Sequence, residues 1–265
     1  MKCIVKLSNF IIFTVFVIGV IAITPVSMAQ DVDEDENTFD KAELFIELND
    51  TAGDLGLQAF IDGGPYNRFS IKDPRDRTLL LLFNVGRLAK QGLTELFFES
   101  AEPPFDQVSP DIFFRRFPEG IYEFEGRTLD GEKLENDVEF THVLPAAPEN
   151  INITGIPAAE DCDALVLPEI NAAINPVIID WDAVTESHPE IGVSDSGIEI
   201  TGYKVFVLRE EPELLEFSID LPPTITEVEI PAGFIALGDE FKFEIQTFES
   251  SGNITAIETC FKVIN

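Results

Sequence analysis

The sequence has few of the residues that carry most catalytic and metal chemistry. Its 265 residues include two histidines, three cysteines and one tryptophan. His142 and His188 are far apart, and no two cysteines lie at metal-binding spacing. We therefore expect neither a zinc site nor a nucleophile–histidine triad. We expect His142 to be a partly buried structural side chain at a strand end, and His188 to be exposed in a Ser-His-Pro loop.

Positive charge is also scarce, with 17 Lys and Arg against 49 Asp and Glu. The first 29 residues hold two lysines and no acid, so the remainder has 15 bases against 49 acids, a net charge of −34. Such a surface repels phosphate backbones and anionic membranes, and we predict no nucleic-acid partner. The charge either keeps the protein in solution or attracts divalent cations.

The N-terminus has the pattern of a secretory signal over residues 1–29. Lys2 and Lys6 precede an apolar run of 14 residues, and Ser27-Met28-Ala29 forms a cleavage site before Gln30. The run is shorter than the ~20 residues of a membrane span, so we expect no membrane insertion after cleavage. An uncleaved anchor is the alternative. The acidic residues 30–41 are expected to be a disordered leader, and the protein to be secreted, either extracellular or periplasmic.

From residue 42 onwards the pattern is that of β-strands. Apolar residues alternate with polar ones over residues 42–48 and 55–61, which predicts half-buried strands. Gly, Pro and Asp predict turns at residues 62–65 and 72–76. The apolar residues 79–85 predict a strand buried on both faces, and residues 93–99 another strand.

A short helix and a hairpin follow these strands. Ser109, Pro110 and Asp111 are typical of a helix start, and we expect a helix over residues 110–116. Residues 122–126 and 138–143 then form a hairpin. In the second half, Phe241, Phe243 and Ile245 alternate with polar residues in the same way.

Two resemblances carry the fold assignment. Gly120-x-Tyr122-x-Phe124, with the turn Asp130-Gly131 and its return strand, resembles the last two strands of an immunoglobulin-like domain. Residues 149–265 resemble a fibronectin type III domain. That second match rests on Pro176 before the Trp181 strand, on Gly202-Tyr203 and its strand, and on residues 226–230, 241–247 and 252–253.

The second match has two departures, namely Phe241 in place of the family's corner tyrosine and an insert at residues 158–175. The resemblances imply an all-β chain of two tandem β-sandwiches, an immunoglobulin-like module over residues 42–146 and a fibronectin type III-like module over residues 147–265. Residues 144–148 would be a stiff, short linker.

Two features suggest covalent or ionic sites. Cys162 and Cys260 are the two cysteines left after signal cleavage, and an even number in a secreted chain predicts one disulfide. It would strap the insert over the outer face or edge of the sheet; two free thiols are the alternative. Glu47, Asn49, Asp50 and Asp54 surround a Gly-containing loop with the oxygen ligands that calcium prefers. The alternative is a polar turn with side-chain hydrogen bonds.

Asn49, Asn152 and Asn253 are each followed by Thr two residues later, so each is a glycosylation acceptor if the source is eukaryotic.

These observations predict a secreted, non-enzymatic interaction or adhesion protein. Its partner would be an unidentified extracellular protein or glycan, and no cofactor is expected apart from calcium. A calcium-dependent structural module is one alternative, and an accessory module of a carbohydrate-acting enzyme is another. The 23 Phe against three Tyr and one Trp favour core packing over sugar binding, because sugar-binding surfaces use Trp and Tyr.

Overall fold

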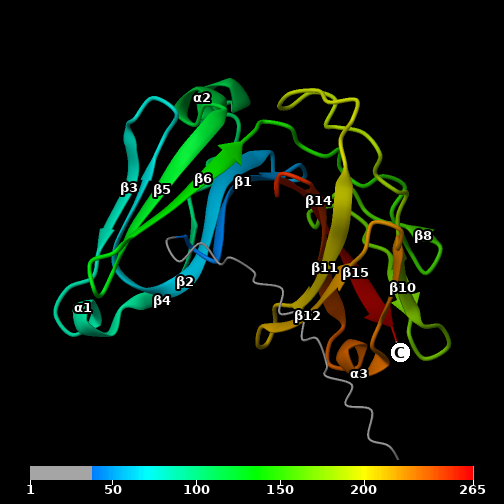
Figure 1. Cartoon of the computed structure of the whole chain (residues 1–265). Coiled ribbons are helices and arrows are strands. Elements are labelled where there is room, and N and C mark those ends of the chain that lie inside the picture. The colour runs from blue at the N-terminus through cyan, green and yellow to red at the C-terminus, as the bar shows by residue number, and fades with distance from the viewer. Residues whose placement is uncertain (1–37, 265) are drawn as a thin grey trace, which may run out of the picture. The chain divides into compact units, whose positions relative to one another are not determined.

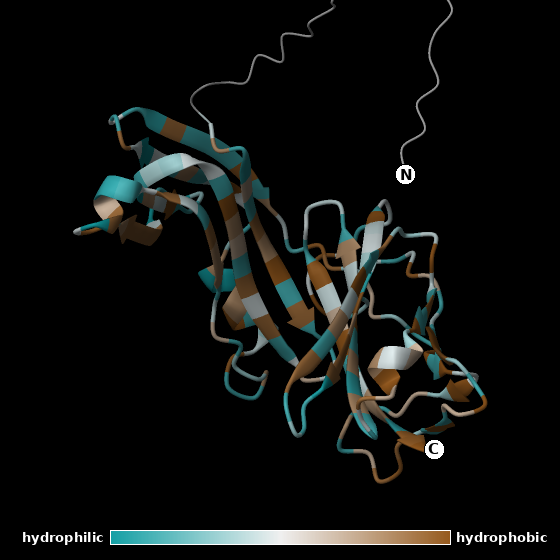
Figure 2. Ribbon diagram, turned by 90° about the horizontal axis from the view of Figure 1, so that it is seen from below, coloured by the Kyte–Doolittle hydropathy of each residue, from teal (hydrophilic) through white to brown (hydrophobic). Residues whose placement is uncertain are grey.

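The structure is a computed structural model, and it describes residues 38–264. The predicted signal at residues 1–29 and nearly all of the acidic leader lie outside this range. The described chain is mostly β, and hydrophobic and polar residues alternate along many of its strands (Figure 2). None of its described helices has the length and apolar character needed to cross a membrane.

The strands before residue 141, which we call the first module, form one continuous hydrogen-bonded sheet that folds around one core (Figure 1). The elements are β1 (Lys41–Asn49), β2 (Asp54–Lys72), β3 (Thr78–Phe83), α1 (Leu88–Gln91), β4 (Leu93–Glu99), α2 (Pro110–Arg116), β5 (Gly120–Thr128) and β6 (Lys133–Phe140). The first half of β2 pairs with β1 and β4, and its second half with β3 and β5. β2 thus pairs with four strands along its length and joins them into one sheet.

The continuity of β2 corrects one prediction. Residues 62–65 were expected to form a turn between strands, but they lie inside β2. Gly63 lies against Phe39, where an added Cβ would come within 3.3 Å of the Phe39 backbone. Gly63 therefore lets the strand bend closely around the core.

A second correction concerns β3. Residues 79–85 were expected to be buried on both faces, but Leu81 is 48% exposed and Phe83 is 55% exposed. β3 pairs with β2 on one side and with no described strand on the other. A continuous apolar run does not distinguish a central strand from an edge strand, and here it is an edge.

Local signals predicted the helix and the hairpin correctly. α2 begins at Pro110 and ends at Arg116, as expected from Ser109 and Pro110. β5 and β6 pair from Gly120↔Phe140 to Arg127↔Lys133. The Tyr122 hydroxyl donates to the Pro118 carbonyl at 3.0 Å, the corner hydrogen bond of immunoglobulin-like domains.

The remaining strands, which we call the second module, have the topology of a fibronectin type III domain. They are β7 (Asn152–Ile153), β8 (Ile156–Pro157), β9 (Glu169–Asn171), β10 (Val177–Asp180), β11 (Ile200–Arg209), β12 (Leu215–Leu221), β13 (Glu227–Ile230), β14 (Glu240–Glu249) and β15 (Ile254–Ile264), with α3 (Ala232–Ile235). One sheet has the order β13-β10-β7-β8, and the other runs β12-β11-β14-β15.

Trp181 lies in the core of the second module, as predicted. It is 4% exposed, and its ring packs edge-on against Tyr203 with 5.3 Å between centroids. Its indole nitrogen has no hydrogen-bond partner in the described structure, so its contribution is apolar packing.

Trp181→Ala is expected to lower the free energy of unfolding by about 3–5 kcal/mol, the range for removing a large aromatic side chain from a core. Trp181→Phe should lose less, because no indole hydrogen bond is given up. Denaturant unfolding followed by circular dichroism measures both. Equal stability of the alanine variant and the wild type would contradict the core position.

The disulfide between Cys162 and Cys260 is confirmed, with 98 residues of sequence separation. Cys260 lies on β15 opposite Lys242, on the face that carries Glu258. Ile257, Phe261 and Val263 face the core. The bridge therefore straps the insert onto the outer face of β15, as the strand alternation predicted.

The two modules are joined by strand pairing as well as by the linker. β1 pairs in parallel with β15, from Glu47↔Ile254 to Asn49↔Ala256, and this extends one sheet to 11 strands. The linker is also fixed, because Leu144 O accepts from His188 N at 2.8 Å and Pro145 O accepts from Thr255 Oγ1 at 2.7 Å. Residues 144–148 are thus attached to the second module. The division at residues 146/147 stays a prediction; the two hydrophobic clusters separate near it.

Candidate functional site

The four residues predicted to bind calcium separate into two groups. Asn49 Oδ1 accepts from Ala52 N at 2.9 Å, and Gly53 N donates to Asn49 O at 2.8 Å. These bonds form a turn closed by the Asn49 side chain. Asp50 Oδ1 instead lies 3.1 Å from His188 Nε2, in the second module.

Glu47 and Asp54 belong to a cluster of carboxylates near the β1–β15 pairing, and Asp54 also lies opposite Asn49 in the β1–β2 ladder. We call this cluster the junction acids; its members are Glu47 on β1, Asp54 on β2, Glu99 at the end of β4, Glu102 after it, Glu244 on β14 and Glu258 on β15. Within residues 38–264, no three or more His, Cys, Asp or Glu side chains are arranged to hold a metal ion. Calcium binding by Glu47, Asn49, Asp50 and Asp54 stays a prediction.

Glu47 is the centre of this cluster and links the two modules. Its carboxylate accepts from Gln58 Nε2 of β2 and, at 3.3 Å, from Gln246 Nε2 of β14. Gln246 Nε2 also donates to Glu244 Oε1 at 2.7 Å. Two glutamine amides therefore supply donors between carboxylates that would otherwise repel one another.

Burial and mutual repulsion hold protons on this cluster. Burial, followed by the charge of Glu244, raises the pKa of Glu47 to about 7. Burial, followed by the charges of Glu99 and Glu47, raises the pKa of Glu102 to about 7. Glu102 lies directly over Gly56, where an added Cβ would collide with its carboxylate. Near neutral pH both groups are therefore partly protonated.

Because of the junction acids, we expect the free energy of unfolding to depend on pH. The folded pKa of Glu47 lies above the unfolded value of 4.5, so the folded chain holds more protons between pH 4.5 and about 7. The free energy of unfolding therefore falls as pH rises through this window. At about 1.4 kcal/mol for each pKa unit, Glu47 contributes up to about 3 kcal/mol of this change.

Thermal melts of Glu47→Gln between pH 5 and 8 check this prediction. The melting point of the variant should fall much less with rising pH than that of the wild type, since a neutral amide occupies the position at every pH. Glu139→Gln, on the exposed face of β6, is the matched control and should keep the wild-type slope. A wild-type melting point that rises over the same range would contradict the assignment.

The histidines gave one confirmed and one wrong prediction. His142 is buried, and its Nε2 lies 2.7 Å from Phe117 O, as expected for a structural side chain. His188 was expected to be exposed but is only 8% exposed. Its Nδ1 accepts from Glu190 N and Ile191 N at 3.2 and 2.9 Å, so Nε2 carries the proton that is donated to Asp50. The loop folds onto the first module, which residue type alone did not indicate.

Asn253 holds the junction together, whereas from the sequence it was considered as a glycosylation acceptor and as part of the turn at residues 252–253. Its side chain is buried, Nδ2 donates to Val143 O at 2.7 Å and to Thr141 O at 3.1 Å, and Oδ1 accepts from Ile46 N at 2.8 Å. A glycan on Nδ2 would break these contacts. Asn152 Nδ2 is also engaged, with Asp180 Oδ1 at 3.0 Å.

The strand pairing defines the class of this protein as two tandem β-sandwich modules of the immunoglobulin-like and fibronectin type III fold. One disulfide lies within the second module. No family model matches the chain, and no curated protein matches it.

Several solved structures are similar to parts of the chain, at low identity and low TM-score. A two-domain fibronectin type III segment of chicken tenascin is 9% identical, with a TM-score of 0.26 over 84% of this chain and 97% of that one. A tetra-tandem repeat from the extending region of a large adhesion protein is 10% identical, with a TM-score of 0.26 over 84% of this chain and 50% of that one. The Clostridium perfringens spore cortex lytic enzyme SleM is 19% identical, with a TM-score of 0.26 over 44% of this chain and 28% of that one.

Proposed function

We propose that this chain is a secreted, non-enzymatic interaction protein whose two β-sandwich modules act as one stiff unit. The observation that carries the proposal is the junction, where β1 pairs with β15 and the buried Asn253 binds backbone groups of the first module. A freely jointed pair of modules would not need such contacts. A stiff pair holds the surfaces of both modules at a fixed distance and orientation. Less conformational entropy is then lost when a partner binds to both.

Two further observations support secretion and binding without catalysis. The pattern of residues 1–29 is typical of export, and the disulfide is of the kind that persists in oxidising compartments. The junction acids are the carboxylates nearest in character to a hydrolase pair, but of the six only Glu258 lines any of five cavities of the described structure, so no two of them share one of these cavities. A glycosidase needs its carboxylates on a substrate-sized cleft.

Binding to cells tests the proposal. The protein from residue 30 to residue 265 is labelled with a fluorophore, incubated with cells and extracellular matrix, and measured by flow cytometry and surface retention. We expect saturable retention that excess unlabelled protein displaces, together with no release of reducing ends from a panel of polysaccharides. Non-saturable retention, or sugar release, would contradict the proposal.

A calcium-dependent structural module is the second candidate, favoured by the crowding of the junction acids. A cation that binds only the folded state stabilises it by about 2.7 kcal/mol at a hundredfold excess over Kd. Millimolar calcium should then raise the melting point by several degrees more than magnesium does, and Asp54→Ala should remove the difference. Asp220→Ala, on β12, is the control. Equal effects of the two ions would leave residues 49–54 as a turn.

A further inference from the structure

β3 presents an open backbone edge in the first module. Asn84 N donates to Asn67 O at 2.9 Å, and the pairing continues with Phe69↔Leu82 and Ile71↔Leu80. Because hydrogen-bonded pairs alternate along an antiparallel ladder, the amide groups of Leu81 and Phe83 point away from β2. No described strand lies on that side of β3. The edge therefore has free donors and acceptors for another strand.

The β3 edge lacks the charged side chains that protect most edge strands from pairing. Its sequence is Thr-Leu-Leu-Leu-Leu-Phe. In contrast, β4 and β12 each carry two acids, and β6 carries three. Leu81 and Phe83 are about half exposed, and Val85, just beyond the strand, is 76% exposed. The edge is thus both open and apolar.

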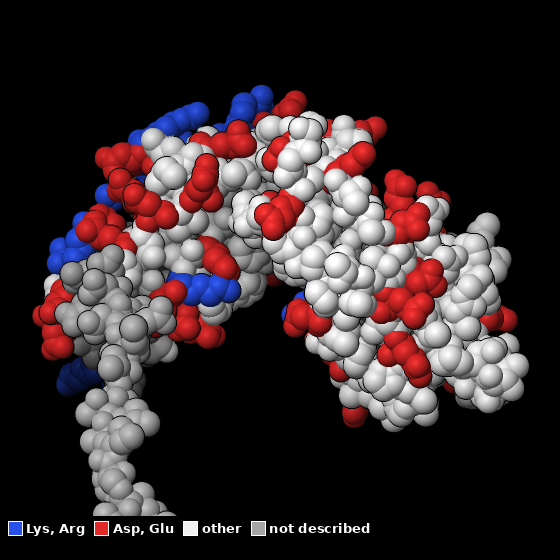
Figure 3. All heavy atoms as spheres, turned by 45° about the vertical axis from the view of Figure 1, so that its right-hand side comes forward, with Lys and Arg blue, Asp and Glu red and all other residues white. Residues whose placement is uncertain are grey.

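Basic residues flank this edge in a chain that is otherwise strongly acidic. Residues 67–92 contain six bases and two acids, a local charge of +4 against −32 for the whole sequence. The bases are Arg68, Lys72, Arg75, Arg77, Arg87 and Lys90. In Figure 3, the visible Lys and Arg side chains lie mostly over the first module.

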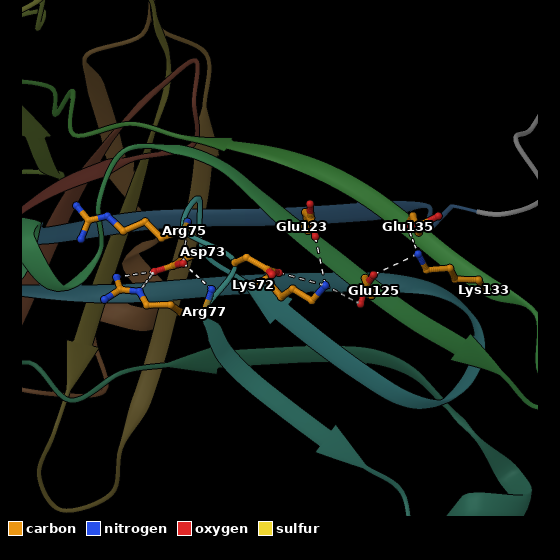
Figure 4. A network of polar contacts seen from close by, with 9 residues as sticks. Lys72, Asp73, Arg75, Arg77, Glu123, Glu125, Lys133 and Glu135 are labelled. Carbon is orange, nitrogen blue, oxygen red and sulfur yellow. Dashed lines mark hydrogen bonds and ion pairs between the residues drawn. The ribbon is translucent and has the colours of Figure 1, made fainter.

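Part of this positive charge is available to a partner. Arg77 pairs with Asp73 at 2.6 Å, and Lys72 lies between Glu123 and Glu125 (Figure 4). Among the described residues, no carboxylate lies within ion-pair distance of Arg75, which precedes β3, or of Arg87 and Lys90, which follow it. Unpaired bases therefore stand beyond both ends of the strand.

We propose that the β3 edge binds an extended acidic segment of a partner protein, which adds to the sheet as a further strand. Main-chain hydrogen bonds to Leu81 and Phe83 would supply affinity, and alternate apolar side chains of the segment would cover Leu81 and Phe83. Carboxylates at its two ends would reach Arg75 and the pair Arg87 and Lys90. A second copy of this chain is a poor occupant, because it would bring the same positive segment against itself. The inference rests on the proposed function and names its binding surface.

A synthetic probe tests the surface directly. It is a blocked peptide of six alternating valine and threonine residues with two glutamates at each end, added to the ¹⁵N-labelled protein of residues 30–265. We expect amide shifts centred on Leu81 and Phe83 and at least tenfold slower hydrogen exchange of these two amides. A peptide with lysines in place of the glutamates should bind at least tenfold more weakly.

Variants separate charge from backbone pairing. Arg87→Glu with Lys90→Glu should weaken binding at least tenfold, whereas Lys204→Glu with Lys262→Glu, the same charge change in the second module, should alter it less than twofold. Leu81→Pro removes an edge N–H and should abolish binding. If that variant does not fold, the probe N-methylated at alternate residues makes the same test on the unchanged protein.

Three results would overturn the inference: equal binding of both peptides, shifts centred outside residues 78–90, or a β3-mediated dimer in light scattering. If these occur while the protein is still retained on cells, the β3 surface is wrong and the proposed function stands. Loss of cell retention in the wild type itself would contradict the proposed function.

Discussion

Replacing Asn253 with alanine is expected to lower the free energy of unfolding by about 3–6 kcal/mol, because one buried and two partly buried backbone groups lose their partner at once. These groups are Ile46 N, Thr141 O and Val143 O. Asn253 is 1% exposed, so water does not replace the amide readily. The three groups belong to β1 and to the chain that leaves β6, and the loss therefore falls on the junction.

Two measurements check this result. Denaturant unfolding gives the free energy, and limited proteolysis reports whether residues 144–148 become accessible. Asn152→Ala is the matched control, since its amide lies in a partly exposed strand and its loss should change stability by less than about 1 kcal/mol. An Asn253→Ala protein as stable and as resistant to protease as the control would show that the junction does not depend on this side chain.

Local patterns predicted much of the fold. The alternation along β14, the helix start at Ser109 and the Trp181 strand all depend on neighbouring residues, and each is found where it was expected. The β3 run failed because burial on both faces depends on whether another strand lies beside it. His188 failed for a similar reason, since its partner Asp50 is 138 residues away.

The candidate site shows the same limit more clearly. Sequence proximity placed Glu47 with Asn49, Asp50 and Asp54, but the Asn49 side chain closes its own turn and Asp50 contacts His188 of the second module. The glutamine on β14 that donates to Glu47, Gln246, is 199 residues away from it in the sequence. That contact exists only because β1 pairs with β15 and β15 with β14. A pairing between two modules leaves no periodic signal in either one.

Removing the disulfide is expected to lower the free energy of unfolding by about 4–5 kcal/mol in the chain-entropy model, because the bridge closes a long loop in the unfolded chain. The loop spans 98 residues, from the insert to β15. Residual structure in the unfolded state reduces the measured value below this figure. Since stability of a domain is typically ~5–15 kcal/mol, the second module would keep only a small margin.

The double variant Cys162→Ser with Cys260→Ala tests this expectation, with alanine at Cys260 because that side chain is 7% exposed and a hydroxyl there would be buried. Wild-type protein reduced with a thiol is the control that separates the bridge from the substitutions. Both should melt well below the oxidised protein, and by similar amounts. Because β15 also pairs with β1, the first module should lose part of its support in both samples. Two titratable thiols in the untreated native protein, or an unchanged melt after reduction, would show that the strap does not hold the insert to the last strand.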